Sequence, residues 1–173
     1  MNLSPEKTKR EFVFDTSTLI ILVEKCGLSD AFTRLAQERK LYVPTRVVEE
    51  FLVGSNFNDH KRTLRDCFIP LNVTLADELL PYFNFKSTSG EIWVISYALR
   101  NPSCFCVIDE EFGRNICKLF SINVTGAIGI IDEMKRDGIL SSSDLHCIRD
   151  KIRSTRFYLS KYLCDELDRI CLT

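Results

Sequence analysis

Two short apolar segments that each end in an aspartate place the strongest constraint on the fold. Residues 11–14 lead into Asp15, and residues 104–108 lead into Asp109. Both segments are rich in the aromatic and β-branched residues that are typical of buried strands. Because segments with helical spacing follow them, the pattern predicts βαβ units. We therefore expect a parallel sheet with helices on both faces.

The rest of the chain continues this alternation of strands and helices. Glycines, prolines and capping residues mark the ends of the segments, with Thr45 and Thr74 as predicted N-caps. Residues 54–67 are polar, and residues 54–58 read as a loop. The other predicted strands are 41–43, 68–73 (at a sheet edge) and 122–124, and the predicted helices are 18–26, 29–36, 45–52, 74–80, 90–100, 111–120, 125–137, 143–153 and 160–171.

The predicted fold class is a three-layer α/β/α domain with a central parallel sheet of about four or five strands. Helices at the C-terminus complete it. A chain of 173 residues suits one domain with a single core.

The formal net charge of -1 argues against a broad basic face for duplex nucleic acid. Any contact with nucleic acid must therefore rest on local patches, bound metal or a partner. Two basic clusters and three aromatics are candidates, although solvated charges and core packing are the favoured interpretations. These residues are Lys61, Arg62 and Arg65; Arg149, Lys151, Arg153 and Arg156; and Phe57, Tyr82 and Phe83.

The eight cysteines show no spacing that predicts a zinc site. None forms a C-x-x-C pair, and the chain has only two histidines. Most of the cysteines lie among apolar residues, where free thiols behave as small core residues. The N-terminal residues are polar and no apolar run reaches membrane-spanning length, so a reducing cytoplasm is the expected location and no membrane contact is expected.

Asp15 and Asp109 are the first candidates for chemistry. If their strands are neighbours where the strand order reverses, both carboxylates face one crevice. Two carboxylates held close together repel each other unless a cation lies between them. Mg²⁺ or Mn²⁺ suits such a site, because both are hard ions that prefer oxygen ligands.

Two glutamates have suitable positions for the same site. Glu50 shares a predicted helical face with apolar residues, and Glu91 lies in the first turn of its helix. Taken alone, Glu91 reads more readily as a partner of the helix dipole and Glu50 as a solvated glutamate. We interpret the adjacent Glu49, Glu110 and Glu111 as solvated charges.

Taken in order, these segments resemble the PIN domain family, and within it the VapC-like archaeal and bacterial ribonucleases. The resemblance rests on four motifs and a closing segment and covers about residues 11 to 140. They are Val13-Phe14-Asp15-Thr16-Ser17-Thr18-Leu19-Ile20, Val43-Pro44-Thr45-Arg46-Val47-Val48-Glu49-Glu50-Phe51-Leu52, Gly90-Glu91 with the helix to Leu99, Val107-Ile108-Asp109-Glu110 with Arg114, and Val124-Thr125-Gly126 with the helix to Leu140.

The resemblance implies a metal-dependent endoribonuclease. Asp15, Glu50, Glu91 and Asp109 would ligate one or two Mg²⁺ or Mn²⁺ ions, which activate a water for in-line attack on an RNA phosphodiester. Ser17 and Thr125 would be hydrogen-bonding neighbours of the metal or phosphate, or helix N-caps.

The resemblance also carries expectations about partners and domains. The protein would act on RNA, with single strands as the expected form, and would be the toxin of a toxin–antitoxin pair with a protein inhibitor. A homodimer is expected as well, for which an apolar C-terminal helix is available. The expected organisation is a flexible N-terminus (1–10), a PIN-like catalytic domain (11–140) and a C-terminal helical extension packed on it (141–173).

Three other functions compete with this one. A phosphatase of the haloacid-dehalogenase type would need a second aspartate where Ser17 stands, and a receiver domain would need an acidic pair after a strand. The third alternative is a catalytically silent PIN-like module for RNA or protein binding, against which the presence of all four acids argues.

Overall fold

The structure, a computed structural model, describes residues 9–53, 57–83, 89–154 and 161–172. Within these residues, five parallel strands form one sheet in the order β3-β2-β1-β4-β5. The strands are β1 (Glu11–Phe14), β2 (Lys40–Pro44), β3 (Ile69–Leu71), β4 (Cys104–Val107) and β5 (Val124–Thr125). The predicted parallel sheet is therefore confirmed, including the edge position of β3.

The central strand β1 lies between β2 and β4 and pairs in parallel with both. Phe14 is in register with Val107, and the Asp15 amide extends this ladder by donating to the Val107 carbonyl at 3.2 Å. The chain runs outward from β1 to β3 on one side and then returns to β4 on the other side. The strand order consequently reverses between β1 and β4, where open α/β sheets bind their ligands.

Helices cover both faces of the sheet. On one face, α5 (Gly90–Arg100) packs on β1, β2 and β4, beside α6 (Glu111–Leu119). On the other face, α2 (Ser29–Glu38) packs on β2 and against α4 (Phe57–Cys67). Right-handed crossovers explain this division, because the β1–β2 and β3–β4 connections run in opposite directions along the sheet. The three-layer α/β/α prediction is confirmed.

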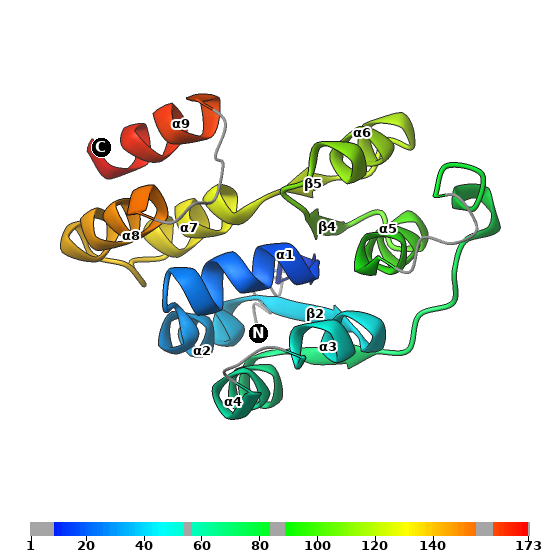
Figure 1. The fold of residues 1–173 in the computed structure, drawn as a ribbon, viewed down its shortest axis with the longest axis horizontal. Coiled ribbons are helices and arrows are strands. Elements are labelled where there is room, and N and C mark those ends of the chain that lie inside the picture. Colours follow the sequence, from blue (N-terminus) through cyan, green and yellow to red (C-terminus); the bar gives the residue numbers. More distant parts are fainter. Residues whose placement is uncertain (1–8, 54–56, 84–88, 155–160, 173) are drawn as a thin grey trace, which may run out of the picture.

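The remaining helices are α1 (Thr16–Leu19), continued by the π-helical η1 (Ile20–Lys25); α3 (Thr45–Phe51); the short 3₁₀ helix η2 (Asp77–Leu79); α7 (Ala127–Arg136); α8 (Ser142–Ser154); and α9 (Lys161–Leu172). At the C-terminal end, α9 packs on both α7 and α8 (Figure 1). Within the described ranges, no helix is both long and apolar enough to cross a membrane.

Aromatic packing around β1 forms the centre of the core. Phe14, Phe32 and Phe68 come from β1, α2 and the segment before β3, and their ring centroids lie 5.2 to 5.7 Å apart. Burying one such side chain stabilises the fold by roughly 2 kcal/mol. The thiols expected in the core are mostly buried, namely Cys26, Cys67, Cys104, Cys106, Cys117 and Cys171.

The predicted helix over residues 74–80 is wrong. Only η2 is helical there, and Ala76 before it is extended. Groups on α5 occupy the backbone atoms that a helix would use, because the Ala76 amide donates to Ser96 Oγ at 3.0 Å and Arg100 donates to the Leu75 carbonyl at 3.0 Å. The segment is therefore held as a strap across α5.

Two further local predictions differ from the structure. Thr45 does not cap α3: it is the first helical residue, and its hydroxyl donates to the Leu71 carbonyl at 3.0 Å. The predicted loop is wrong at residues 57–58, where α4 begins, and the polar stretch after it, which had no predicted structure, is helical to Cys67. The buried face of α4 includes the polar residues His60 and Thr63. Because these two residues are polar, the sequence did not show the amphipathic pattern of the helix. His60 stacks on Phe51 with ring centroids 4.2 Å apart.

Several predictions fall on residues outside the described ranges. These are most of the flexible N-terminus, the side chain of Phe57, Arg156, and part of the apolar C-terminal segment expected at a dimer interface. The division of the chain at residue 140 stays a prediction. On the C-terminal side of it, Leu167 and Ile170 of α9 are buried.

Candidate active site

Asp15 lies at the carboxyl end of the central strand and is the N-cap of α1. Only 4% of it is exposed, and its Oδ2 accepts hydrogen bonds from Ser17 Oγ at 2.5 Å and Ser17 N at 3.3 Å. Burial raises the pKa of its carboxyl to about 6, although the bonds from Ser17 oppose this effect. Ser17 thus fixes the orientation of a buried, uncompensated acid.

Asp109 follows the neighbouring strand β4 at the same sheet edge. Its carboxylate accepts hydrogen bonds from Thr18 Oγ1 at 3.0 Å and from the Ala127 amide at 3.0 Å. Burial raises the pKa of Asp109, while these bonds and the nearby Arg114 lower it. A Cβ at Gly126 would lie 2.3 Å from Asp109 Oδ1, so a glycine is needed for this close approach.

Glu91 belongs to the first turn of α5 and points into the protein. Its exposed fraction is 6%, and its Oε1 is buried without a hydrogen-bond partner. Burial, together with the charges of Asp15 and Glu110, raises the pKa of Glu91 to about 7. On α6, a Cβ at Gly113 would lie 2.6 Å from this Oε1. The side chain is therefore enclosed near Asp15, unlike an exposed partner of the helix dipole.

Glu50 on α3 has a different environment. It is half-buried, accepts a hydrogen bond from Thr16 Oγ1 at 2.7 Å, and pairs with Arg46 Nε at 3.4 Å. Its Oε2 lies 3.0 Å from the position of a Cβ on Gly90, the residue before Glu91. The four predicted acids thus border one region at the carboxyl edge of the sheet, with Glu50 at its margin.

The acids next to the predicted ligands are exposed, but one of them acts on the site. Glu49, Glu110 and Glu111 all have exposed side chains. Glu110 nevertheless raises the pKa of both Asp15 and Glu91 through its charge. The exposure of Glu110 agrees with its interpretation as a solvated charge. Its effect on the pKa values of the site was not predicted from the sequence.

The hydroxyl groups at the site come from one turn of helix. Thr16, Ser17 and Thr18 contact Glu50, Asp15 and Asp109, respectively. Only Ser17 was predicted from the sequence. The start of a helix directly after Asp15 is the sequence signal that could have identified Thr16 and Thr18. Thr125, the other predicted neighbour, lines a cavity of about 160 Å³ with Asp109 and Arg114.

The residues present fit a hard divalent cation, although they do not form a finished cage. No group of three His, Cys, Asp or Glu side chains within the described ranges is arranged to hold a metal ion. The donors are nonetheless all carboxylates, and one buried oxygen, Glu91 Oε1, has no partner. The ion pairs found in the described part of the chain all join other residues and leave out Asp15, Glu91 and Asp109. Negative charge without compensation is what a cation would relieve.

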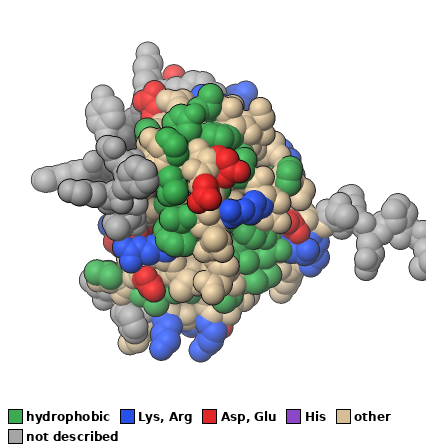
Figure 2. Space-filling view, turned by 90° about the vertical axis from the view of Figure 1, so that its right-hand side faces the viewer, with side chains coloured by type: hydrophobic (Ala, Val, Ile, Leu, Met, Phe, Trp, Pro, Cys, Tyr) green, Lys and Arg blue, Asp and Glu red, His purple; other side chains and the backbone are tan. Residues whose placement is uncertain are grey.

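Several members of the two basic clusters pair with acids or carbonyls. Arg65 pairs with Asp66 at 2.6 Å, Arg149 with Asp150 at 3.3 Å, and Lys151 donates to the Cys26 carbonyl at 3.1 Å. On the face shown in Figure 2, separate Lys or Arg groups and Asp or Glu groups lie among hydrophobic side chains. These observations agree with the interpretation of both clusters as solvated charges.

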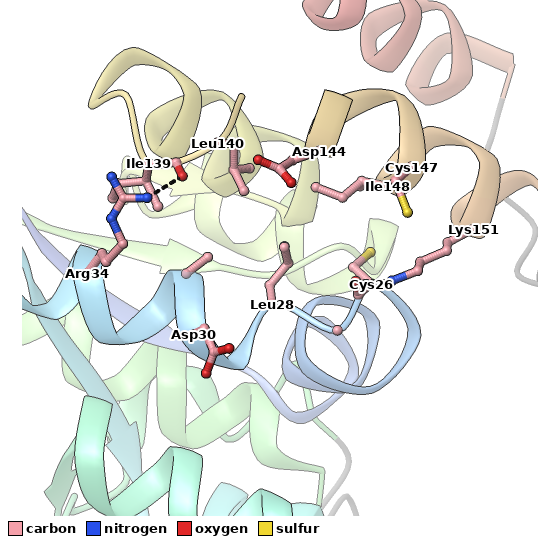
Figure 3. Close-up of a pocket in the computed structure, with 12 residues that line it drawn as sticks. Cys26, Leu28, Asp30, Arg34, Ile139, Leu140, Asp144, Cys147, Ile148 and Lys151 are labelled. Atoms are coloured by element: carbon pink, nitrogen blue, oxygen red, sulfur yellow. Dashed lines mark hydrogen bonds between the residues drawn. The ribbon is translucent and has the colours of Figure 1, made fainter. Parts of the chain in front are cut away.

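A cavity of about 280 Å³, lined by none of the four acids, lies between the start of α2 and the turn from α7 to α8 (Figure 3). Its cationic side chains join these elements through backbone carbonyls. Arg34 donates to Ile139 O at 2.7 Å, and Lys151 donates across the cavity to Cys26 O. We therefore interpret the cavity as a gap in the packing between these elements.

A comparison with protein families identifies the family of the chain. A family model described as a PIN domain matches residues 11–170. Neither the curated proteins nor the solved structures contain a significant match to the chain. The matched range includes all five strands and all four acids, and it extends through most of α9. The chain therefore belongs to the PIN domain family.

Proposed function

We propose that the protein is a metal-dependent endoribonuclease that hydrolyses phosphodiester bonds of single-stranded RNA. PIN domains are typically nucleases, and PIN nucleases generally use divalent metals. The observation that carries the proposal is the buried pair Asp15 and Glu91. Each has a raised pKa, and Glu91 Oε1 has no partner. Uncompensated acids at a strand-order reversal support a cation-binding catalytic site.

Asp15, Glu50, Glu91 and Asp109 would hold Mg²⁺ or Mn²⁺. When bound, the metal would lower the pKa of a water and stabilise charge on the leaving oxygen. The chain's own residues orient the ligands. Ser17 fixes Asp15, Thr18 and the Ala127 amide fix Asp109, and Thr16 with Arg46 fixes Glu50. Such supporting hydrogen bonds usually tune metal affinity.

Glu91 is the proposed ligand whose protonation should change most when a metal binds. It has no hydrogen bond at Oε1, and its charge is opposed by Asp15 and Glu110. Loss of its proton is favoured once positive charge approaches, so metal affinity should rise with pH. Glu110, exposed at the rim, adds negative charge that attracts the cation.

The narrower assignments rest on the family resemblance. We propose a VapC-like toxin located in the cytoplasm, held inactive by an antitoxin protein and active as a homodimer. Residues 11–140 would form the catalytic domain, and residues 141–173 would form an extension packed on it. A small open reading frame directly upstream of the gene would support the toxin role.

The test is RNA cleavage with single-stranded substrates in Mn²⁺, with and without a chelator. Cleavage should require the metal and should be lost in Asp15→Asn and Asp109→Asn. Glu111→Gln is the matched control, because it removes an exposed acid from the same sheet edge. Cleavage that persists in both aspartate variants would contradict the metal site, and the absence of cleavage across varied substrates would favour a silent RNA-binding or protein-interaction module.

A further inference from the structure

A second cavity lies at the same sheet edge as the acids, beyond the ends of β2 and β3. Its volume is about 220 Å³, and its lining includes Arg46, Glu49, Asn72 and Trp93. Thr45 and Asn72 directly follow the last residues of the two strands. Neighbouring strands lie about 4.8 Å apart, so this cavity begins one to two strand spacings from the end of β1 and Asp15.

The walls of this cavity are fixed by the same elements that carry the acids. Trp93 lies in the first turns of α5, two residues after Glu91. Arg46 lies in the first turn of α3 and pairs with Glu50 at 3.4 Å and with Glu49 at 3.3 Å. The hydrogen bond from Thr45 Oγ1 to Leu71 O joins the start of α3 to the end of β3. The cavity thus shares α3 and α5 with the site, and its lining includes none of the four acids.

The chemistry of the lining matches a nucleotide. A partly buried indole offers a face on which a base can stack, and stacking on an aromatic accepts any base. Asn72 and Glu49 offer hydrogen-bonding groups at the mouth, where both are exposed. Arg46 supplies a guanidinium, which pairs with Glu49 and Glu50 in the protein without RNA. An aromatic, an amide and a guanidinium together are the groups that proteins use to bind single-stranded RNA.

We propose that this cavity is a nucleobase subsite, in which Trp93 stacks on a base of the RNA strand next to the phosphodiester over the acids. The inference rests on the proposed function, since it assumes that RNA is the substrate. It assigns Trp93 and Asn72 to substrate positioning. The subsite would set the register of the strand at the acids and would favour unpaired bases over duplex, because a base must leave its partner to enter.

Trp93 is the only tryptophan in the chain, so its fluorescence reports on the subsite directly. The wild-type protein is titrated with a short single-stranded RNA in chelator, which prevents cleavage, while fluorescein anisotropy of the RNA reports total binding. Both signals should saturate together, with Trp93 quenched by the stacked base. The equivalent duplex should give weaker quenching.

Variants test the assignment without relying on one substitution. Trp93→Ala should weaken RNA binding by about tenfold, and Trp93→Phe should restore most of it, because a phenyl ring can also stack. Asn72→Ala changes an exposed side chain and should weaken binding a few-fold without affecting folding. Tyr82→Ala is the control, since Tyr82 is an exposed aromatic that contacts Phe120 and does not line the cavity.

The outcomes separate this subsite from the proposed function. RNA that binds by anisotropy without quenching Trp93, or that binds Trp93→Ala and Asn72→Ala as tightly as wild type, overturns the subsite and leaves the nuclease intact. Saturable quenching in a protein that never cleaves supports the subsite and overturns the nuclease. Absence of RNA binding by either signal overturns the subsite as well.

Discussion

Buried acids have opposite surroundings at the two edges of the sheet. At the amino edge, Glu133 is 7% exposed and pairs with Arg10 and with Arg39 at 3.3 Å. Arg39 also pairs with Asp137 at 2.9 Å. At the carboxyl edge, Asp15 and Glu91 are equally buried, yet they take part in none of the described ion pairs, and burial raises the pKa of each.

The difference separates acids that stabilise the fold from acids that are available to bind a ligand. A buried charge is costly unless it is paired, so a structural acid is accompanied by an arginine. Acids kept close together without a cation reduce stability, and such an arrangement is typical of a functional site. The amino edge thus pairs its buried acid with arginines, whereas Asp15 and Glu91 at the carboxyl edge have no positive partner among the described ion pairs.

Glu91→Gln should give the largest effect at the carboxyl edge. Loss of a metal ligand should lower RNA cleavage by at least about a hundredfold, measured as initial rates in Mn²⁺. The metal-free variant should be at least as stable as wild type at about pH 8, because a neutral side chain removes the repulsion from Asp15. A variant that is inactive and also strongly destabilised without metal would show that Glu91 is a structural acid.

Arg39→Ala should give the corresponding effect at the amino edge. It leaves Glu133 and Asp137 with less compensation and should lower the free energy of unfolding by about 2 kcal/mol, measured by urea denaturation. At urea concentrations too low to unfold the variant, its RNA cleavage should equal that of wild type. Arg65→Ala is the matched control, because its pair with Asp66 is fully exposed and solvent screens its contribution to stability. Equal losses from both variants would contradict a special role for the amino-edge network.

The carboxyl edge should also make metal-free stability depend on pH. The folded pKa values of Asp15 and Glu91, about 6 and about 7, exceed the ordinary values of 3.8 and 4.5. The folded state therefore holds more protons than the unfolded state between about pH 4 and pH 7. The stability that these two groups contribute is fully present below this window and is lost across it as the pH rises.

Thermal denaturation in chelator measures this pH dependence. The midpoint should fall by roughly 5 °C from about pH 5 to about pH 8, and Mg²⁺ should reverse the fall at the higher pH. Glu91→Gln should flatten the profile, whereas Glu133→Gln should leave this slope in place. A wild-type profile that rises across the same window would mean that the two acids are compensated in solution.

Thr18→Val should give the smallest of these effects. The substitution keeps the shape of the side chain but removes the hydrogen bond to Asp109 Oδ2, so cleavage should fall by about tenfold. Raising the Mn²⁺ concentration should recover part of the loss, because the ligand remains but is less well oriented. Thr33→Val, which removes a hydroxyl that contacts Ser29 and lies away from the acids, should have wild-type activity. Equal activity in both variants would show that Asp109 needs no support from Thr18.

Strand positions could be predicted because each depends on a local pattern, whereas Glu50 and Glu91 were favoured as metal ligands only through the family resemblance. The apolar run before Asp15 and the one before Asp109 define β1 and β4, and parallel strands bring their ends to one edge. The strap over residues 74–80 could not be predicted, because Ser96 and Arg100 of α5 hold it through contacts distant in sequence. The same holds for the charge of Glu110 on Asp15 and Glu91, which depends on how α5 and α6 face β1.

Metal binding by the purified protein tests the central claim most directly, without assuming any RNA substrate. Isothermal titration of the metal-free protein with Mn²⁺ should show saturable binding that strengthens from about pH 6 to about pH 8, as Asp15 and Glu91 lose their protons. Binding should be abolished by Asp15→Asn and retained in Glu111→Gln. Absence of Mn²⁺ binding to the wild-type protein, or equal binding to Asp15→Asn, would contradict the assignment of the carboxyl edge as a metal site.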